Sequence, residues 1–346
     1  MTSRERIQAA LDYRPVDVVP LRIYAAAGGL HEHGQKLLDL IHACGHDFGS
    51  LANVALPAPL PATDFDPDGA YHAFRTDEWG TRWEFRIPGI WGHPVAWPVE
   101  DLDTAESYPM PLPPPPLRGA ELEAARRTVV EHQLHGFRLD GAGSLFEKLH
   151  SIRRFEDVLV DLALDDPRLH RLADRITEHL VARAGRAIAM GSDAISVGDD
   201  YGTSTAMMMS PECWRHFFKP RYERVFAPAR AAGLRIFFHV CGWVKPILED
   251  FRDLGVNAIW PQLTLFPPAE LHARCRDLGL AVEIHPDRGE LMQHGTPTQV
   301  RDYVRRMVDE LHTLDGGSWL YLEVDPGFPW PNVEALFTTA MELRSQ

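Results

Sequence analysis

The chain has 346 residues, of which 45% are hydrophobic and 24% are charged, so it holds enough apolar material for one large core. Its formal net charge of -14 argues against binding to nucleic acid, because a phosphate backbone requires clustered lysine and arginine. The same charge argues against binding to anionic membrane surfaces.

The spacing of the cysteines and the character of the first residues indicate the cellular compartment of the protein. The cysteines at positions 44, 213, 241 and 275 form no Cys-x-x-Cys pair. The first residues, MTSRERIQAALDY, are polar and helix-like, without the basic-then-apolar pattern of a secretory signal. We therefore expect a cytoplasmic protein with reduced cysteines and no membrane-spanning segment. The sequence leaves the oligomeric state open, with a homodimer among the options.

Short β-like runs alternate with longer helical patterns along the chain. The expected strands are residues 18–24, 136–140, 194–197, 234–240, 258–260, 280–284 and 319–324, with a weaker eighth run at 50–55. The helical patterns include residues 120–132, 165–190, 211–232 and 297–311. Such alternation predicts a parallel sheet with right-handed crossovers. About eight units favour a closed (β/α)8 TIM barrel, with residues 1–346 as a single domain.

One stretch, residues 64–116, breaks this alternation. Residues 64–98 are rich in tryptophan and alternate like a short hairpin, and residues 111–116 are a proline-rich run that we interpret as a stiff surface connector. We expect the insertion to form a lid beside the active-site mouth. Trp79, Trp83 or Trp91 would then lie beside the mouth and pack on a flat substrate or on a corrinoid, and Trp79 is our candidate for substrate binding.

The strongest chemical signal is LRIFFHVCGW, in which His239 and Cys241 stand two residues apart at the end of a predicted strand. Side chains two apart on a strand share a face, and the strand ends of a parallel barrel form its catalytic side. An imidazole and a thiolate on one face suit zinc. The alternative is a buried histidine hydrogen-bonded to the backbone, beside a cysteine that acts as a small hydrophobic residue.

A zinc ion requires a third ligand, and Glu323 on the last predicted strand is our candidate. A glutamate in an apolar strand needs a partner, because burying a bare carboxylate is costly. That partner is either the metal or a nearby arginine or lysine. Glu283 and His285, on the preceding strand, compete with Glu323 as metal donors, and His285 is also a candidate for substrate binding.

A second signal follows the strand at residues 194–197, in the run SVGDDYGTS. Asp199 and Asp200 should face opposite ways, so at most one of them points into the mouth. We assign Asp200 and Tyr201 to catalysis or substrate orientation and Asp199 to substrate binding. The alternative is a turn whose acidic residues cap a helix.

The chain resembles the uroporphyrinogen-decarboxylase-like superfamily, and within it most closely the corrinoid-dependent methyltransferase branch. The motifs that carry the resemblance run in family order along nearly the whole chain: RERIQAALDYRPVDVVP, DEWGTRWE, GSLFEKLHSIRRFEDVLVDLALDDP, DAISVGDDYGTSTAMMMSPECWRHFFKPRYERV, HVCG, GTPTQVRDYV and PWPNVEAL. The resemblance implies a TIM barrel. It further implies that His239 and Cys241 bind zinc together with a later cysteine.

That later cysteine is absent here, where the chain reads YLEVDPG, and Glu323 is the nearest residue with a ligand group. A carboxylate makes zinc a harder Lewis acid, which suits an oxygen substrate such as a methyl ether at least as well as a thiol. The resemblance thus implies a zinc-dependent methyltransferase that exchanges a methyl group between a small molecule and a corrinoid (cobalamin) on a partner protein, as in an O-demethylase component.

Two alternatives to the methyltransferase stay open. One is a metal-free lyase like uroporphyrinogen decarboxylase, with Asp200 stabilising charge. The decarboxylases carry several arginines in their opening segment, whereas here that segment has only Arg22. The other alternative is a barrel that binds a tetrapyrrole or corrinoid without catalysis.

Overall fold

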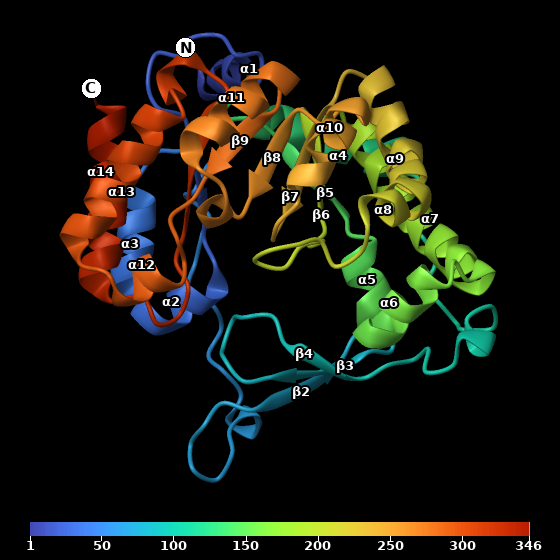
Figure 1. Ribbon diagram of the computed structural model, residues 1–346. Coiled ribbons are helices and arrows are strands. Elements are labelled where there is room, and N and C mark those ends of the chain that lie inside the picture. The colour runs from blue at the N-terminus through green and yellow to red at the C-terminus, as the bar shows by residue number, and fades with distance from the viewer. Residues whose placement is uncertain (346) are drawn as a thin grey trace.

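The chain folds into a curled parallel sheet covered on its outside by helices, as seen in the computed structural model, which describes residues 1–345 (Figure 1). Its strands are β1 (Leu21–Tyr24), β5 (Leu139–Gly143), β6 (Ala194–Gly198), β7 (Arg235–Val240), β8 (Ala258–Pro261), β9 (Ala281–Ile284) and β10 (Ser318–Glu323). Their order is β1-β10-β9-β8-β7-β6-β5, and each neighbouring pair is parallel. The predicted α/β class and parallel sheet are confirmed, although β5 begins three residues later than expected.

Long helices form most of the outer layer. They are α3 (Gln35–Ala43), α4 (Gly119–Gln133), α6 (Phe155–Ala163), α7 (Pro167–Met190), α9 (Lys219–Ala231), α11 (Pro268–Leu278), α13 (Pro297–Glu310) and α14 (Trp330–Arg344). The other helices are α1 (Ser3–Leu11), α2 (Ala27–His33), α5 (Phe146–Ile152), α8 (Pro211–Phe217), α10 (Leu248–Asp253) and α12 (Glu290–His294). The pattern at residues 211–232 thus forms two helices, α8 and α9, rather than one.

Local side-chain chemistry explains where several helices begin. Ser210 accepts a hydrogen bond from the backbone N–H of Cys213 at the start of α8, and Pro211 occupies the first helical position. Thr296 and Gln299 form a reciprocal capping box at the start of α13. These contacts use backbone donors that the first helical turn leaves without a partner.

Aromatic rings fill the interior of the curled sheet at the end where its strands begin. Phe48, Phe137, Phe237 and Trp319 contact one another with ring centroids 5.3 to 6.3 Å apart. Helix α1 closes this end and contributes Ile7 and Leu11 to the same buried cluster. The cluster forms a floor, so any cavity in the sheet opens toward the strand ends.

The predicted eighth strand at residues 50–55 is wrong, because the structure describes these residues and assigns no strand to them. Asp47 instead links β1 to the segment just before β5. Its N–H donates to the carbonyl of Leu21, and its carbonyl accepts from the N–H of Phe137, each at 2.8 Å. Its carboxylate accepts a further bond from the N–H of Leu21 at 2.8 Å. The sheet is therefore curled like a barrel wall but has no ladder of hydrogen bonds between β1 and β5.

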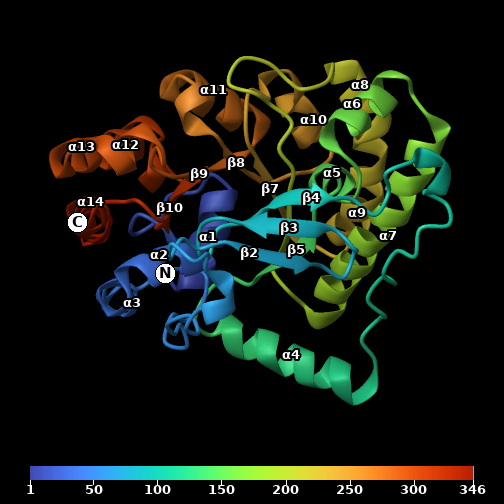
Figure 2. The same ribbon diagram turned by 90° about the horizontal axis from the view of Figure 1, so that it is seen from below.

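The tryptophan-rich insertion forms a small antiparallel sheet of β2 (Ala73–Thr76), β3 (Arg82–Phe85) and β4 (His93–Ala96). It lies beyond the end of the main sheet where the parallel strands finish, and Figure 2 shows it crossing that end. The turn between β3 and β4 packs closely on α2, since a methyl group on Gly89 would lie 2.3 Å from the backbone nitrogen of Gly28. The hairpin predicted for residues 64–98 is thus present, with one additional strand.

The hydropathy of the helices shows whether any of them could cross a membrane. Among residues 1–345, the structure contains no helix with the length and apolar character that crossing a membrane requires.

The junction at Asp47 predicts how stability depends on pH. Nδ1 of the neighbouring His46 lies 3.2 Å from the N–H of Ile23 and accepts its hydrogen bond, which requires a neutral ring. Burial lowers the pKa of His46 from 6.5 to about 4. Between these values the unfolded chain binds more protons than the folded chain, so stability falls as the pH falls.

We predict that His46→Asn, which keeps an acceptor but does not titrate, removes this pH dependence. The wild type should lose about 2 kcal/mol more unfolding free energy than the variant between roughly pH 7.5 and roughly pH 5. Urea unfolding of both proteins at the two pH values measures the difference. Equal losses in the two proteins would contradict the account.

Candidate active site

His239 and Cys241 lie together at the end of β7, on one face as predicted. Nε2 of His239 is 3.6 Å from Sγ of Cys241. The ring of His239 packs on Trp260 of β8, its register partner, with centroids 4.2 Å apart. Packing against a neighbouring strand fixes the ring, while Nε2 stays directed toward the cysteine.

Asp200 completes the group from the neighbouring strand end. Its Oδ1 is 3.4 Å from Nε2 of His239 and accepts a hydrogen bond of 2.7 Å from the N–H of Cys241. The ligand atoms of Asp200, His239 and Cys241 all lie within 4.8 Å of one another. The site thus gathers one oxygen, one nitrogen and one sulfur donor.

Backbone contacts hold the two strand-end loops together. The N–H of Gly202 donates to the carbonyl of Cys241 at 3.3 Å, and the N–H of Trp243 donates to the carbonyl of Thr203 at 2.7 Å. Gly242 has a φ of 83°, and a methyl group there would lie 2.0 Å from the carbonyl oxygen of Gly202. Only glycine fits this conformation and this close approach, so a larger residue at position 242 would push the two loops apart.

Asp199 faces away from the site, as the alternation of side chains requires. Its carboxylate accepts hydrogen bonds of 2.8 to 3.0 Å from the N–H groups of Leu145, Phe146 and Glu147, at the start of α5. It also accepts from the hydroxyls of Tyr201 and Tyr222. Burial raises the pKa of Asp199 to about 6, while these donors oppose the shift.

The predicted roles of Asp199 in substrate binding and of Tyr201 in catalysis are contradicted by these positions. Both residues are 0% exposed. The ring of Tyr201 stacks on Phe146 with centroids 5.4 Å apart. The alternative interpretation, acidic residues that cap a helix, is correct for Asp199 alone.

Glu323 does not join the donor group, so its prediction as the third ligand is wrong in this structure. One of its oxygens, Oε2, lies 3.1 Å from Nη1 of Arg288 and accepts a hydrogen bond of 2.8 Å from the hydroxyl of Tyr321. Arg288 also makes two hydrogen bonds of 2.6 Å to Asp325. The partner that a buried glutamate needs is here an arginine.

Two cavities meet at His239 and Trp260, which line both. The first, which we call the chamber, has a volume of about 300 Å³ and extends from His239 to Phe237 and Trp319 in the floor. The second, the side cavity, has a volume of about 220 Å³ and is lined by Cys241, His285 and Arg288 among others. His239 of the donor group thus faces both cavities, and Cys241 faces the side cavity.

The other residues predicted to contact the substrate, His285 and the tryptophans of the insertion, lie in different surroundings. His285 lines the side cavity, but both its ring nitrogens lie 2.9 Å from backbone carbonyl oxygens, those of Pro261 and Pro286. Trp79 lines neither cavity, because its buried ring packs on His179 with centroids 4.6 Å apart. Trp91 is 76% exposed on the insertion. The structure therefore gives Trp79 a packing role.

Burial controls the protonation of the donor group. It raises the pKa of Cys241 to about 12, and the adjacent carboxylate of Asp200 adds to the shift. It lowers the pKa of His239, which keeps the imidazole neutral. A neutral imidazole is ready to bind a metal, whereas the thiol loses its proton when a cation approaches. Nitrogen, sulfur and oxygen donors together form a set that fits zinc.

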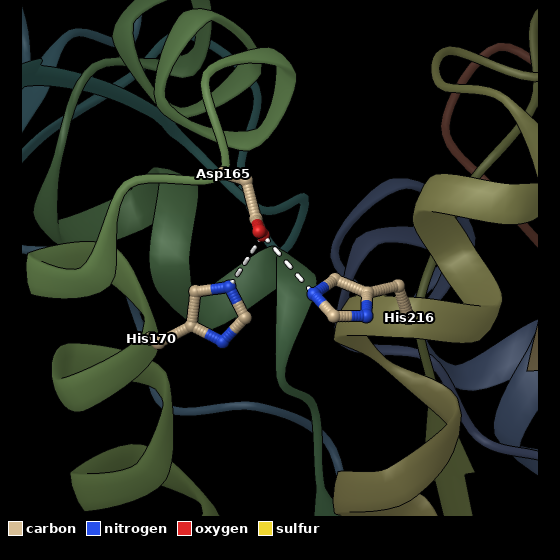
Figure 3. A group of neighbouring side chains, drawn as sticks. All are labelled: Asp165, His170 and His216. Atoms are coloured by element: carbon tan, nitrogen blue, oxygen red, sulfur yellow. Dashed lines mark hydrogen bonds and ion pairs between the residues drawn. The ribbon is translucent and has the colours of Figure 1, made fainter.

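A second group of metal-type side chains lies on the outer helices (Figure 3). Oδ1 of Asp165 lies 2.8 Å from Nε2 of His170 and 3.3 Å from Nε2 of His216. Nη2 of Arg221 is 3.3 Å from Nδ1 of His170, and a guanidinium only donates. Nδ1 therefore accepts, and Nε2 carries the proton shared with Asp165. No lone pair is left there for an ion, so this group is a hydrogen-bonded surface network.

The model of the family described as uroporphyrinogen decarboxylase (URO-D) matches residues 140–342. The chain belongs to this family. The predicted resemblance is therefore confirmed at the family level, and the matched residues include all of β5 except Leu139, β6 to β10 and the whole donor group.

Individual relatives agree with the family assignment. Two curated uroporphyrinogen decarboxylases from strains of Thermus thermophilus are 27% and 26% identical over 107 residues, which cover 31% of this chain and 30% of each relative. The match therefore spans less than a third of the relatives' length. A solved structure described as a methyltransferase from Methanosarcina mazei aligns with a TM-score of 0.64 and 17% identity over 99% of both chains. At this identity, the likeness shows a shared fold.

Sequence reasoning missed several residues around the donor group. Arg22 and Trp260 line the chamber, and the role of Asp200 as a donor beside Cys241 was not foreseen. A signal existed for Arg22, because Arg22 and Glu283 are opposite charges within apolar strands. The sequence indicated Asp200 as a site residue but gave no signal that it lies beside Cys241, because that distance depends on the register of β6 against β7.

Because Asp199 and Asp200 point in opposite directions, we predict that replacing Asp199 lowers stability, whereas replacing Asp200 lowers zinc affinity. Asp199→Asn should lower the unfolding free energy by roughly 3 kcal/mol, because an amide cannot accept bonds from all the buried donors. Asp200→Asn keeps an acceptor for the N–H of Cys241 and should change stability by less than about 0.5 kcal/mol. It should nevertheless weaken zinc binding at least about tenfold.

Urea denaturation and competition with a zinc chelator measure the two effects on the same preparations. The account is contradicted if Asp200→Asn is the less stable protein. It is also contradicted if Asp199→Asn is fully stable while it alone loses zinc affinity.

Proposed function

We propose that the protein is a zinc-dependent methyltransferase that exchanges a methyl group between a small methyl ether or thiol and a corrinoid on a partner protein, as in an O-demethylase component. The observation that carries the proposal is the convergence of Asp200, His239 and Cys241 at two adjacent strand ends, beside a chamber. Strand ends are where parallel barrels place their chemistry. The methyltransferase description of the Methanosarcina protein supports the same class.

Asp200 takes the place that the sequence predicted for Glu323 as third ligand. Three protein ligands leave a position for substrate or water, as catalytic zinc sites do. A bound zinc would supply a Lewis acid beside the heteroatom that carries the methyl group. The hydrogen bond from the N–H of Cys241 would orient the carboxylate of Asp200 for this role.

The surrounding residues bind the substrate and exclude water. Phe238, Ile259 and Trp260 give the chamber apolar walls, which strengthen electrostatic interactions at the donor group. The insertion lies across the strand ends, where a lid would shield the reaction (Figure 2). The corrinoid partner would reach the donor group from the mouth, opposite the aromatic floor.

Decarboxylation is the second candidate, because the curated relatives are decarboxylases. A porphyrinogen carries several carboxylates and needs several fixed cations. Among the described residues lining the chamber, Arg22 is the only arginine or lysine, and Glu283 already pairs with it. A chamber of about 300 Å³ is also small for four pyrrole rings. Both observations favour a small substrate, and with it the methyltransferase over a tetrapyrrole-binding barrel.

We predict that Cys241→Ser loses most of its zinc and its methyl transfer together, while its thermal unfolding is unchanged. Cys213→Ser is the matched control, since Cys213 is also partly buried but lies on α8, outside the donor group. Elemental analysis of protein purified without chelator, with a screen of methyl ethers and added corrinoid protein, gives both readouts. A Cys241→Ser protein with full zinc and full activity would show that Cys241 does not hold the ion, whereas a wild type with neither zinc nor methyl transfer would favour the metal-free lyase.

A further inference from the structure

On the wall formed by β1, β9 and β10 the chamber has a polar spot, Arg22 with Glu283, apart from Ser196 on β6 and His239 on β7. Nη1 of Arg22 lies 3.1 and 3.2 Å from the two carboxylate oxygens of Glu283. The indole N–H of Trp319 donates to Oε1 of Glu283 at 2.8 Å. The guanidinium of Arg22 also lies over the rings of Phe48 and Tyr321, at 5.4 and 5.3 Å. The pair is therefore held in place from several sides.

This pair leaves hydrogen-bonding capacity toward the chamber. Among the described contacts, Arg22 donates only through Nη1, and Oε2 of Glu283 accepts only from Arg22. The side chain of Arg22 is 25% exposed, and both residues line the chamber. A hydroxyl group both donates and accepts, so it can bond to Glu283 and Arg22 at once.

The charge of the pair is already balanced. An anion in the chamber would have to share Arg22 with Glu283 and would place a second negative charge beside a carboxylate that is 3% exposed. Uncompensated charge is costly in a buried setting. A molecule with no polar group at this end would leave the spare donors and acceptor of the pair unsatisfied. The pair of Arg22 and Glu283 thus selects against an anion and against a molecule that has no polar group at this end.

The opposite wall gives room for a ring. Gly141, Gly143 and Gly198, on β5 and β6, line the chamber without side chains. A methyl group on Gly141 would meet no atom within 4 Å, which shows the open space directly. Phe237, Phe238 and Trp260 supply flat apolar surfaces. A volume of about 300 Å³ is at the lower end for small-molecule sites, which suits a single ring.

Resting on the proposed function, we propose that the substrate is a neutral, single-ring methyl ether with a hydroxyl group at the far end. The hydroxyl binds between Arg22 and Glu283, and the methyl-bearing oxygen faces His239. Arg22 and Glu283 are then the residues that determine specificity. They select a hydroxyl over a carboxylate and over an unsubstituted ring.

Binding of three matched probes tests this without any methyl transfer: 4-methoxyphenol, 4-methoxybenzoate and anisole. At neutral pH the first is uncharged, the second is an anion, and the third lacks the polar group. Quenching of tryptophan fluorescence reports occupancy, because Trp260 and Trp319 line the chamber. We expect 4-methoxyphenol to bind at least about tenfold more tightly than either of the other probes.

Two variants make the test specific. Glu283→Gln removes the charge that balances Arg22, so the order of the phenol and the carboxylate should reverse, which a merely structural role would not produce. Gly141→Leu fills the open wall and should abolish binding of all three probes while thermal unfolding stays near that of the wild type. It also serves as the test if Glu283→Gln fails to fold.

The outcomes separate this inference from the proposed function. If 4-methoxybenzoate binds the wild type as tightly as 4-methoxyphenol, if no probe binds, or if Gly141→Leu binds normally, the inference is wrong even where methyl transfer to other substrates is found. If 4-methoxyphenol binds as expected but its methyl group is never transferred, the assignment of the chamber stands and the proposed function fails.

Discussion

The carbonyl of His239 accepts a hydrogen bond of 3.1 Å from the N–H of Asp199, which extends the pairing of β6 and β7 beyond the end of β6. This contact keeps the chain extended through two adjacent acids, so their side chains take opposite sides. Asp199 then caps α5 from inside the fold, and Asp200 reaches the N–H of Cys241. The position of the oxygen donor follows from one backbone register.

Burying Asp199 completely is costly, and its three backbone donors and two tyrosine hydroxyls offset that cost. The network links β6 to α5 and α9, which makes the loop that carries Asp200 part of the rigid barrel wall. Metal sites depend on such support, because a ligand held loosely loses affinity. The buried carboxylate of Asp199 thereby positions the donor side chain of Asp200 beside it.

Much of this arrangement could be predicted from sequence. Alternation on a strand placed His239 and Cys241 on one face, and the same rule separated Asp199 from Asp200. Contacts between segments distant in sequence could not be predicted. Arg288, on the loop after β9, pairs with Glu323 and removes it from the donor group. The ring of Phe146 covers Tyr201. Asp47 takes the place of a strand between β1 and β5. Its carboxylate accepts a hydrogen bond from the N–H of Leu21, and a contact of this kind produces no alternating pattern of polar and apolar residues in the sequence.

The central claim is that one sulfur, one nitrogen and one carboxylate oxygen hold the ion. X-ray absorption spectroscopy of the zinc-loaded protein tests it most directly. The account predicts a single sulfur scatterer at about 2.3 Å, with nitrogen and oxygen at about 2.0 to 2.2 Å, and loss of the sulfur signal in Cys241→Ser. A spectrum with nitrogen and oxygen alone in the wild type would contradict it. Such a spectrum would show that Cys241 is not a ligand and would place the zinc outside the donor group.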